Sequence, residues 1–234
     1  MSKLYIIPCP ITEEDPIRTL PISTIEVIHQ LKHFVAERAK TARRFIKLTE
    51  PPYAISEINV EEMDKHDQYD ISEEVIAWAN SGKDIGLLSE AGCPCVADPG
   101  FHVVRLFRER GYKIVPLVGP SSLLLALMAS GLNGQAFTFH GYLPIDENKK
   151  KQVIRKMEST ALKDNYAQIL IETPYRNQKL FSAFCKYLQG ETLLHISLDL
   201  TGEGEYCDSK SVNDWKKTGM TFPKSPAIFI IGKK

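Results

Sequence analysis

Two cysteines separated by one residue, Cys93 and Cys95, are the side chains of this sequence that most readily suggest chemistry. They lie in the segment SEAGCPCVADPG, residues 89–100. Zinc sites usually pair cysteines about two to four residues apart and add a second pair, or histidines, at similar spacing. The sequence has neither, and none of its six histidines forms an H-E-x-x-H motif. We therefore expect no metal here, and we expect the cysteines to fill a turn as small polarizable side chains.

Glycine- and proline-broken loops are the second feature that could support binding. No G-x-x-x-x-G-K-[ST] or G-x-G-x-x-G motif follows an expected strand, and the GEGE at 202–205 carries two glutamates that would repel phosphate. Breakers nevertheless follow three expected strands, at residues 8–10, 92–94 and 119–121. Ligands of open α/β sheets bind at the carboxyl ends of strands. These glycines and prolines therefore indicate either a binding crevice or ordinary loops that only end the strands.

Basic side chains gather in two places, which are Lys40, Arg43, Arg44 and Lys47, and Lys149, Lys150, Lys151, Arg155 and Lys156. Such runs are usually solvated helix faces, and a surface that contacts phosphate is the alternative. Lys plus Arg equals Asp plus Glu at 29 each, so an anionic partner must be held by local patches. Net charge neither supports nor excludes RNA.

The elements that must position these residues alternate between short apolar runs and helical patterns, which is typical of α/β domains. In the first half we expect strands at 4–8, 33–37, 84–89 and 113–118, and helices at 23–32, 39–48, 72–82 and 98–110. Ser23 to Glu26 has the pattern of a capping box, and Ser72 is an expected N-cap. Asp98 is expected as the N-cap of a helix with Pro99 at its first position.

The second half carries fewer helices for each strand. We expect strands at 137–143, 167–173, 193–200, 205–212 and 227–231, and helices at 121–130, 148–159 and 174–188. This ratio favours a mixed sheet. We predict an α/β fold of two α/β domains, 1–117 and 118–234, the first with a mostly parallel sheet and the second with a mixed sheet.

Composition points to a soluble, cytoplasmic protein. The five cysteines are odd in number and irregularly spaced, and the start MSKLYIIPCP lacks the features of a signal peptide. A reducing compartment is expected. The longest apolar run, at 122–129, is far shorter than the roughly 20 residues that cross a bilayer, so no membrane span is expected.

Several blocks resemble one known family. SEAGCPCVADPGFHVVR (89–105) resembles the S-D-A-G-T-P-G-I-S-D-P-G-Y-x-L-V signature of the tetrapyrrole methylase superfamily, most closely its branch of small-subunit ribosomal RNA ribose 2'-O-methyltransferases. Five more blocks resemble that branch, namely LYIIPCPI (4–11), FVAERAKTARRFI (34–46), VGPSSLLLALMASGL (118–132), ILIETPYR (169–176) and LDLTGEGE (198–205). They follow the family's order, so the resemblance covers nearly the whole chain.

The resemblance implies S-adenosyl-L-methionine held in a cleft between the two domains, a homodimer, and ribosomal RNA or the small ribosomal subunit as partner. The cofactor contacts that it implies fall on Ile11, Gly92, Cys93, Pro94, Val96, Ser121, Ser122, Ile171 and Ala227. Most of these residues are small or apolar, so we expect the contacts in the loop to be made mainly by the backbone.

The chain departs from the family's pattern at three blocks. ITEEDPIRTLP (11–21) replaces a G-N-L-G-D segment, and the E-D-T-R block keeps Glu37 but continues with Arg38, Ala39 and Lys40. The R-E-L-T-K block keeps Thr201 and has Asp199 for Glu, but Leu198 and Gly202 replace its two basic residues. The resemblance therefore implies methyl transfer more firmly than it implies RNA as the substrate.

Roles for individual residues follow from the same resemblance. A ribose hydroxyl would benefit from a general base, for which Glu37 and Glu172 are the candidates, and Arg176 would hold a phosphate or orient a carboxylate. The alternative is that Glu37 and Arg176 pair and are architectural. Expected substrate contacts are Lys40, Arg43, Arg44 and Thr201. Two other functions stay open, a methylase acting on carbon or nitrogen of a small, tetrapyrrole-like molecule and a non-catalytic cofactor-binding module.

Overall fold

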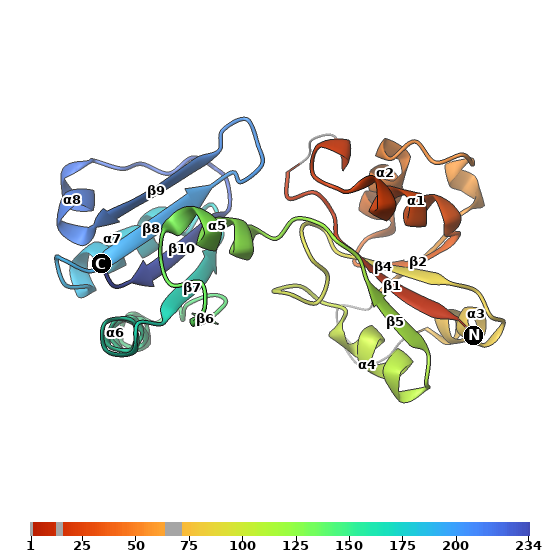
Figure 1. Cartoon of the computed structure of the whole chain (residues 1–234), viewed down its shortest axis with the longest axis horizontal. Helices are drawn as coiled ribbons and strands as arrows, with labels where there is room; N and C mark the ends of the chain where they lie inside the picture. The colour runs from red at the N-terminus through yellow and green to blue at the C-terminus, as the bar shows by residue number, and fades with distance from the viewer. Residues whose placement is uncertain (1, 13–15, 64–71) are drawn as a thin grey trace. The chain divides into compact units, whose positions relative to one another are not determined.

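A computed structural model describes residues 2–12, 16–63 and 72–234. The chain forms two compact units, Met1–Ser121 and Ser122–Lys234. The division falls at the start of a helix, shortly after residue 117, where the sequence suggests a boundary. Each unit has its own sheet and its own core, and each is described by itself (Figure 1).

The first unit is built on one fully parallel sheet. Its strands are β1 (Lys3–Ile7), β2 (His33–Ala36), β3 (Asn59–Glu62), β4 (Ile85–Leu88) and β5 (Lys113–Pro116), in the order β3-β2-β4-β1-β5. The helices are α1 (Ile22–Gln30), α2 (Ala39–Leu48), α3 (Glu73–Asn80) and α4 (Phe101–Glu109), with short 3-10 turns η1 (Pro16–Arg18) and η2 (Ile55–Glu57). The predicted α/β class with a parallel first sheet is confirmed.

Helices cover both faces of this sheet, which is why every residue of β2 and β4 is buried. On one face Phe34 and Ile7 pack with Phe45 of α2 and with residues of α1. On the other face Leu4 packs with Trp78 of α3 and with α4 (Figure 1). The carboxyl ends of β4, β1 and β5 consequently lie side by side at one edge of a rigid layer.

Two predicted helix starts are wrong. Helix α1 has Pro21 as its N-cap, two residues before Ser23, and the Pro21 carbonyl accepts from the backbone of Thr24 and Ile25, so Ser23 does not cap the helix. Helix α4 has Gly100 as its N-cap, with φ of 110°, and Asp98 does not cap it. The expected cap at Ser72 is confirmed, because its side chain accepts from the backbone of Val75.

The second unit has a mixed sheet, as predicted. Its strands are β6 (Phe137–Phe139), β7 (Ala167–Glu172), β8 (Leu193–Leu198), β9 (Tyr206–Ser211) and β10 (Ala227–Gly232), in the order β6-β7-β10-β8-β9. Only the β6–β7 pair is parallel. The helices are α5 (Ser122–Ser130), α6 (Glu147–Asp164), α7 (Asn177–Tyr187) and α8 (Val212–Lys217), of which α8 is not expected from the sequence.

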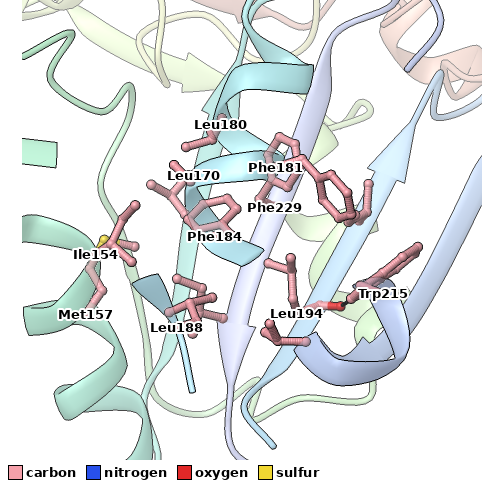
Figure 2. Close-up of a cluster of buried hydrophobic side chains, with 14 of the residues drawn as sticks. Ile154, Met157, Leu170, Leu180, Phe181, Phe184, Leu188, Leu194, Trp215 and Phe229 are labelled. Atoms are coloured by element: carbon pink, nitrogen blue, oxygen red, sulfur yellow. Dashed lines mark hydrogen bonds between the residues drawn. The ribbon is translucent and has the colours of Figure 1, made fainter. Parts of the chain in front are cut away.

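Alternation along β10 divides the core of the second unit. Phe229 faces a cluster formed with α6, α7 and α8, whereas Ile228 and Ile230 face α5. Figure 2 shows the first cluster, in which the indole of Trp215 donates a hydrogen bond of 2.7 Å to the Leu194 carbonyl. None of the described helices is both long and apolar enough to cross a membrane.

Candidate functional site

The loops that follow β1 and β4 are joined by a pair of backbone hydrogen bonds. The amide of Cys9 donates to the Gly92 carbonyl at 2.8 Å, and the amide of Gly92 donates to the Cys9 carbonyl at 3.0 Å. Gly92 has φ of 69°, a conformation that glycine adopts without strain. Two of the three breaker segments found in the sequence are therefore locked together by their main chains.

The loop that follows β5 closes on the same two segments. A side chain added at Gly119 would overlap the ring of Pro8, so only glycine permits this approach. The thiol of Cys93 donates to the Pro120 carbonyl at 3.4 Å. All three breaker segments meet at one edge of the first sheet, which favours a binding crevice over loop punctuation.

The loop after β4 holds an unusual backbone. Besides Gly92 and Gly100, the non-glycine residues Cys95 and Ala97 have φ of 69° and 63°. Left-handed backbone at such residues costs on the order of 1 kcal/mol each and persists only where the surroundings impose it. Strain of this kind gathers at binding loops, where a fixed backbone shape is what the ligand contacts.

The thiols of this region remain protonated near neutral pH. Burial raises the pKa of Cys9 to about 12, and its thiol donates to the Ser89 carbonyl at 3.1 Å. Burial also raises the pKa values of Cys93 and Cys95. Thiolates are the form that binds metal. Within residues 2–12, 16–63 and 72–234 no group of three or more His, Cys, Asp and Glu residues could hold a metal ion.

Acidic side chains give the loop region its charge. Burial, together with the charges of Glu37 and Glu90, raises the pKa of Asp98 to about 6. Three carboxyl groups close enough to influence one another make this edge of the first unit attractive to cations and unfavourable to phosphate.

A cavity of about 200 Å³ opens beside these loops within the first unit. Its apolar side includes Ile11 and Phe45, and its polar side includes Thr41, Arg44 and Glu90. The hydroxyl of Thr12, which also lines it, is buried and has no hydrogen-bond partner among the described residues. The remaining lining residues are Cys9, Pro10, Pro16 and Leu48. Such a lining suits a small ligand with both apolar and polar groups.

One basic residue of α2 reaches this cavity. Arg44 lines it, and Lys40, Arg44 and Lys47 are exposed at helical spacing, whereas Arg43 is half-buried. Glu37 is half-buried directly after β2. Lys40, Arg43 and Arg44 therefore belong to the helix that lines the cavity, and Glu37 lies shortly before that helix.

In the second unit, a buried carboxylate fixes an arginine. Glu172 is 1% exposed, and its Oε2 pairs with Arg176 Nη2 at 3.1 Å. Its Oε1 accepts from the amide and hydroxyl of Thr173 at 2.8 and 3.2 Å. Arg176 Nη2 also donates to the Leu143 carbonyl at 3.0 Å. Both oxygens of Glu172 are engaged, which suits holding Arg176 in place better than accepting a further proton.

The other predicted residues of the second unit lie at strand and helix ends. Ser122 is the first residue of α5. Ala227 of β10 pairs with Glu172 of β7 and is 1% exposed, and the adjacent Ile171 is half-buried. Thr201 has φ of 72° and a buried hydroxyl without a partner among the described residues. In the first unit Pro94 is buried, Val96 exposed and Ser121 half-buried.

Some residues around the cavity are not found by sequence reasoning. Thr41, Phe45 and Leu48 recur at i, i+4 and i+7 on α2, which is a readable helical face. Glu90 and Asp98 carry no comparable signal, because their proximity depends on how the loop folds back.

The family described as "Tetrapyrrole (Corrin/Porphyrin) Methylases" matches residues 3–200. A protein named "Ribosomal RNA small subunit methyltransferase I" from Bacillus subtilis (strain 168) is 34% identical over 206 residues, 88% of this chain and 66% of that protein. Its namesake from Escherichia coli O157:H7 is 30% identical over 158 residues, covering 68% of this chain and 52% of that protein. The chain thus spans about half to two thirds of these relatives.

Solved structures share the fold. A uroporphyrin-III-C-methyltransferase from Thermus thermophilus matches with a TM-score of 0.58 at 18% identity, covering 99% of this chain and 92% of that one. The methyltransferase CobJ matches with a TM-score of 0.64 at 13% identity, covering 100% of this chain and 95% of that one. These matches cover both units.

Proposed function

This chain belongs to the tetrapyrrole (corrin/porphyrin) methylase family, and from that premise we propose that it is an S-adenosylmethionine-dependent methyltransferase that modifies a ribose 2'-hydroxyl of small-subunit ribosomal RNA. The RNA part of the proposal is supported by relatives named for that substrate, of which one is 34% identical. A homodimer in a reducing cytoplasm is part of the same proposal.

The residues of the strand-end loops fit this cofactor. The approach of Gly119 to Pro8 leaves room for no side chain, so the loops offer a flat backbone wall. The orphaned hydroxyl of Thr12 offers a hydrogen bond. The carboxyl groups around Asp98 favour a cation, and a sulfonium cofactor is one. When bound, S-adenosylmethionine supplies an electrophilic methyl group.

The residues proposed to hold the cofactor come from both units. In the first they are Ile11, Gly92, Cys93, Pro94, Val96 and Ser121, and in the second they are Ser122, Ile171 and Ala227. The observation that carries the proposal is the paired hydrogen bond between Cys9 and Gly92, because it fixes the first two loops as one wall. Alignment by a fixed wall is the main demand of a methyl transfer.

The remaining side chains are proposed to act on the substrate. Glu37 is the proposed general base for the hydroxyl, since a carboxylate is suited to accept that proton. Glu172 holds the guanidinium of Arg176, which is presented to a phosphate. Lys40, Arg43, Arg44 and Thr201 are the other proposed substrate contacts.

Two measurements test this proposal. Calorimetric titration with S-adenosylmethionine should show binding. Absence of binding at millimolar ligand would contradict both the RNA methyltransferase and the small-molecule methyltransferase hypotheses. Small ribosomal subunits that lack the modification should then accept methyl groups from the protein. Binding without methyl transfer would indicate a non-catalytic module, and transfer to tetrapyrrole precursors but not to subunits would indicate a small-molecule methylase.

The substrate contacts can be tested with a matched control. The double variant Lys40→Gln and Arg43→Gln should lose activity on subunits while it still binds the cofactor. A double variant at Lys179 and Lys216, both exposed, removes the same charge elsewhere. Equal activity of the two variants would contradict RNA as the substrate of this site.

A further inference from the structure

Helix α6 presents an exposed face whose charged side chains are nearly all basic. Lys149, Lys156 and Lys163 recur every seven residues and therefore share one side of the helix. Arg155 is exposed beside them, and Lys151 is half-exposed. The opposite side of α6, with Ile154 and Met157, is packed into the core shown in Figure 2.

Glu147 is a carboxylate of the helix that meets this face, because its pKa is lowered by the hydrogen bond from Lys150 and also by Lys186 and Tyr187. Glu147 Oε1 accepts a hydrogen bond of 2.6 Å from buried Lys150. Glu158 is 5% exposed and accepts from the Gln189 amide and the Thr192 hydroxyl at 2.7 and 2.6 Å. Asp164 is the last residue of the helix. Between residues 148 and 163 no exposed side chain is acidic.

The exposed cations of this face have no structural task. Lys149, Arg155, Lys156 and Lys163 form no ion pair with any described residue. Solvated cations that stabilise nothing are free to meet an external anion. The four span 15 residues, a rise of about 21 Å along the helix, over which a nucleic acid duplex presents on the order of ten phosphates.

An aromatic ring at the end of α7 lies beside Lys151, at the flank of this exposed side of α6. The Nζ atoms of Lys151 and Lys186 lie 5.9 and 5.2 Å from the ring centroid of Tyr187. Lysines from two helices therefore converge on one half-exposed tyrosine. A ring beside cations can stack on an unpaired base or pack against a sugar.

We propose that this α6 basic face, defined as Lys149, Lys151, Arg155, Lys156 and Lys163 with Lys186 and Tyr187, binds the phosphate backbone of the RNA substrate. The inference rests on the proposed function, because it supplies an RNA-binding surface that belongs wholly to the second unit. Contacts to phosphate position an RNA without reading its sequence. The target nucleotide is selected elsewhere.

The test uses charge removal with a matched control. The α6 variant carries Lys149→Gln, Arg155→Gln, Lys156→Gln and Lys163→Gln, since glutamine preserves helix propensity. The control variant carries glutamine at Lys179, Lys216, Lys224 and Lys233, which are exposed in the same unit. The two variants lose the same charge, and circular dichroism checks that α6 stays folded.

The readout is the salt dependence of RNA binding. Anisotropy of a labelled 30-base-pair RNA duplex is followed across a range of KCl concentrations, and each phosphate contact contributes about 0.9 to the slope of log K against log salt. We expect the α6 variant to lose about 3 from that slope and at least tenfold in affinity at low salt, and the control to stay within about twofold. With small subunits, KM should rise and kcat should hold.

Three outcomes would overturn the inference. One is RNA binding by the α6 variant equal to that of the control. Another is a slope that does not change. For the third, both variants are also mixed with vesicles of phosphatidylglycerol. If the α6 variant loses binding to the vesicles but keeps its affinity for RNA, the face binds a membrane surface. Failure of every variant to bind S-adenosylmethionine would remove the proposed function, whereas the comparison on bare RNA would still decide the α6 basic face.

Discussion

The candidate sites of the two units are built from different materials. In the first unit the strand-end loops are shaped by main chain, through the Cys9–Gly92 hydrogen bonds and the left-handed backbone of Cys95 and Ala97. In the second unit side chains form the candidate sites, namely the Glu172–Arg176 pair and the α6 basic face. Substitutions should therefore act by shape in the first unit and by charge in the second.

The two regions also differ in the sign of their charge. Glu37, Glu90 and Asp98 surround the loops, whereas α6 exposes cations. The chain has 29 basic and 29 acidic residues, so its neutrality conceals two oppositely charged regions. A cationic cofactor would be attracted to the acidic loops, and a polyanionic substrate to the basic side chains of α2 and α6.

The largest effect is expected where a buried side-chain pair is broken. Glu172→Ala leaves the Arg176 guanidinium without its carboxylate and the Thr173 amide without its acceptor. Removing one partner of a buried ion pair costs about 3 kcal/mol or more. Urea unfolding should show this loss, and Glu203→Ala, at an exposed residue, should show almost none. Equal stability of the two variants would mean that side chains do not hold the second site.

A backbone change in the first unit should come next. Gly119→Ala forces a methyl group into the Pro8 ring, and overpacking of this kind costs about 1–3 kcal/mol. We expect the affinity for S-adenosylmethionine to fall at least tenfold, because the wall is displaced. Gly134→Ala, where the added carbon meets nothing within 4 Å, is the control. If the Gly119 variant binds S-adenosylmethionine with unchanged affinity, the wall formed by the strand-end loops does not take part in cofactor binding.

The charge of the loops should have a smaller, pH-dependent effect. The folded pKa of Asp98 is raised from 3.8 to about 6, so its stabilising contribution is complete below pH 3.8 and is lost as the pH rises through about 6. Asp98→Asn removes this titration. After allowance for partial exposure, we expect the variant to exceed the parent by about 1 kcal/mol at pH 8 and to match it near pH 4.

Thermal unfolding at both pH values measures this difference. Glu203→Gln, an exposed residue outside the acidic group, serves as the control. A gain for the Asp98 variant that is the same at pH 4 and pH 8 would show that the acidic group does not control the stability of the loops.

The smallest effect is expected from the two cysteines. Cys95 has φ of 69°, so Cys95→Gly relieves backbone strain in the folded protein. The same change raises the conformational entropy of the unfolded chain, and the two effects on the free energy of unfolding nearly offset one another. Combined with Cys93→Thr, it should leave the affinity for S-adenosylmethionine within several-fold. Calorimetry measures this, and complete loss of binding would show that the sulfur atoms matter beyond the backbone shape.

Most elements could be predicted because their signals are local. The apolar pattern gives the bounds of α2 and the parallel and mixed character of the two sheets. The start of α1 could not be predicted, because the hydroxyl of Thr24 bonds to the carbonyl of Val118, far along the chain. Strand β3 is an edge strand with few apolar residues and owes its form to its partner β2.

Individual residues of the candidate site could be predicted from the sequence, but the contacts that bring them together could not. The breakers after β1, β4 and β5 are visible in the sequence, but the bonds of Cys9 to Gly92 join residues more than eighty positions apart. The proximity of Glu90 and Asp98 depends on left-handed residues that no propensity favours. The basic run of α6 is visible, but only burial of Glu158 and Lys150 shows which charges remain outside.

The most direct test is to locate the transferred methyl group. Small ribosomal subunits that lack the modification are incubated with the protein and with S-adenosylmethionine labelled on its methyl, and the RNA is digested to nucleosides and analysed by mass spectrometry. We expect close to stoichiometric label in a single 2'-O-methylated nucleoside. Label on a base, or none in RNA from a protein that binds the cofactor, would contradict it.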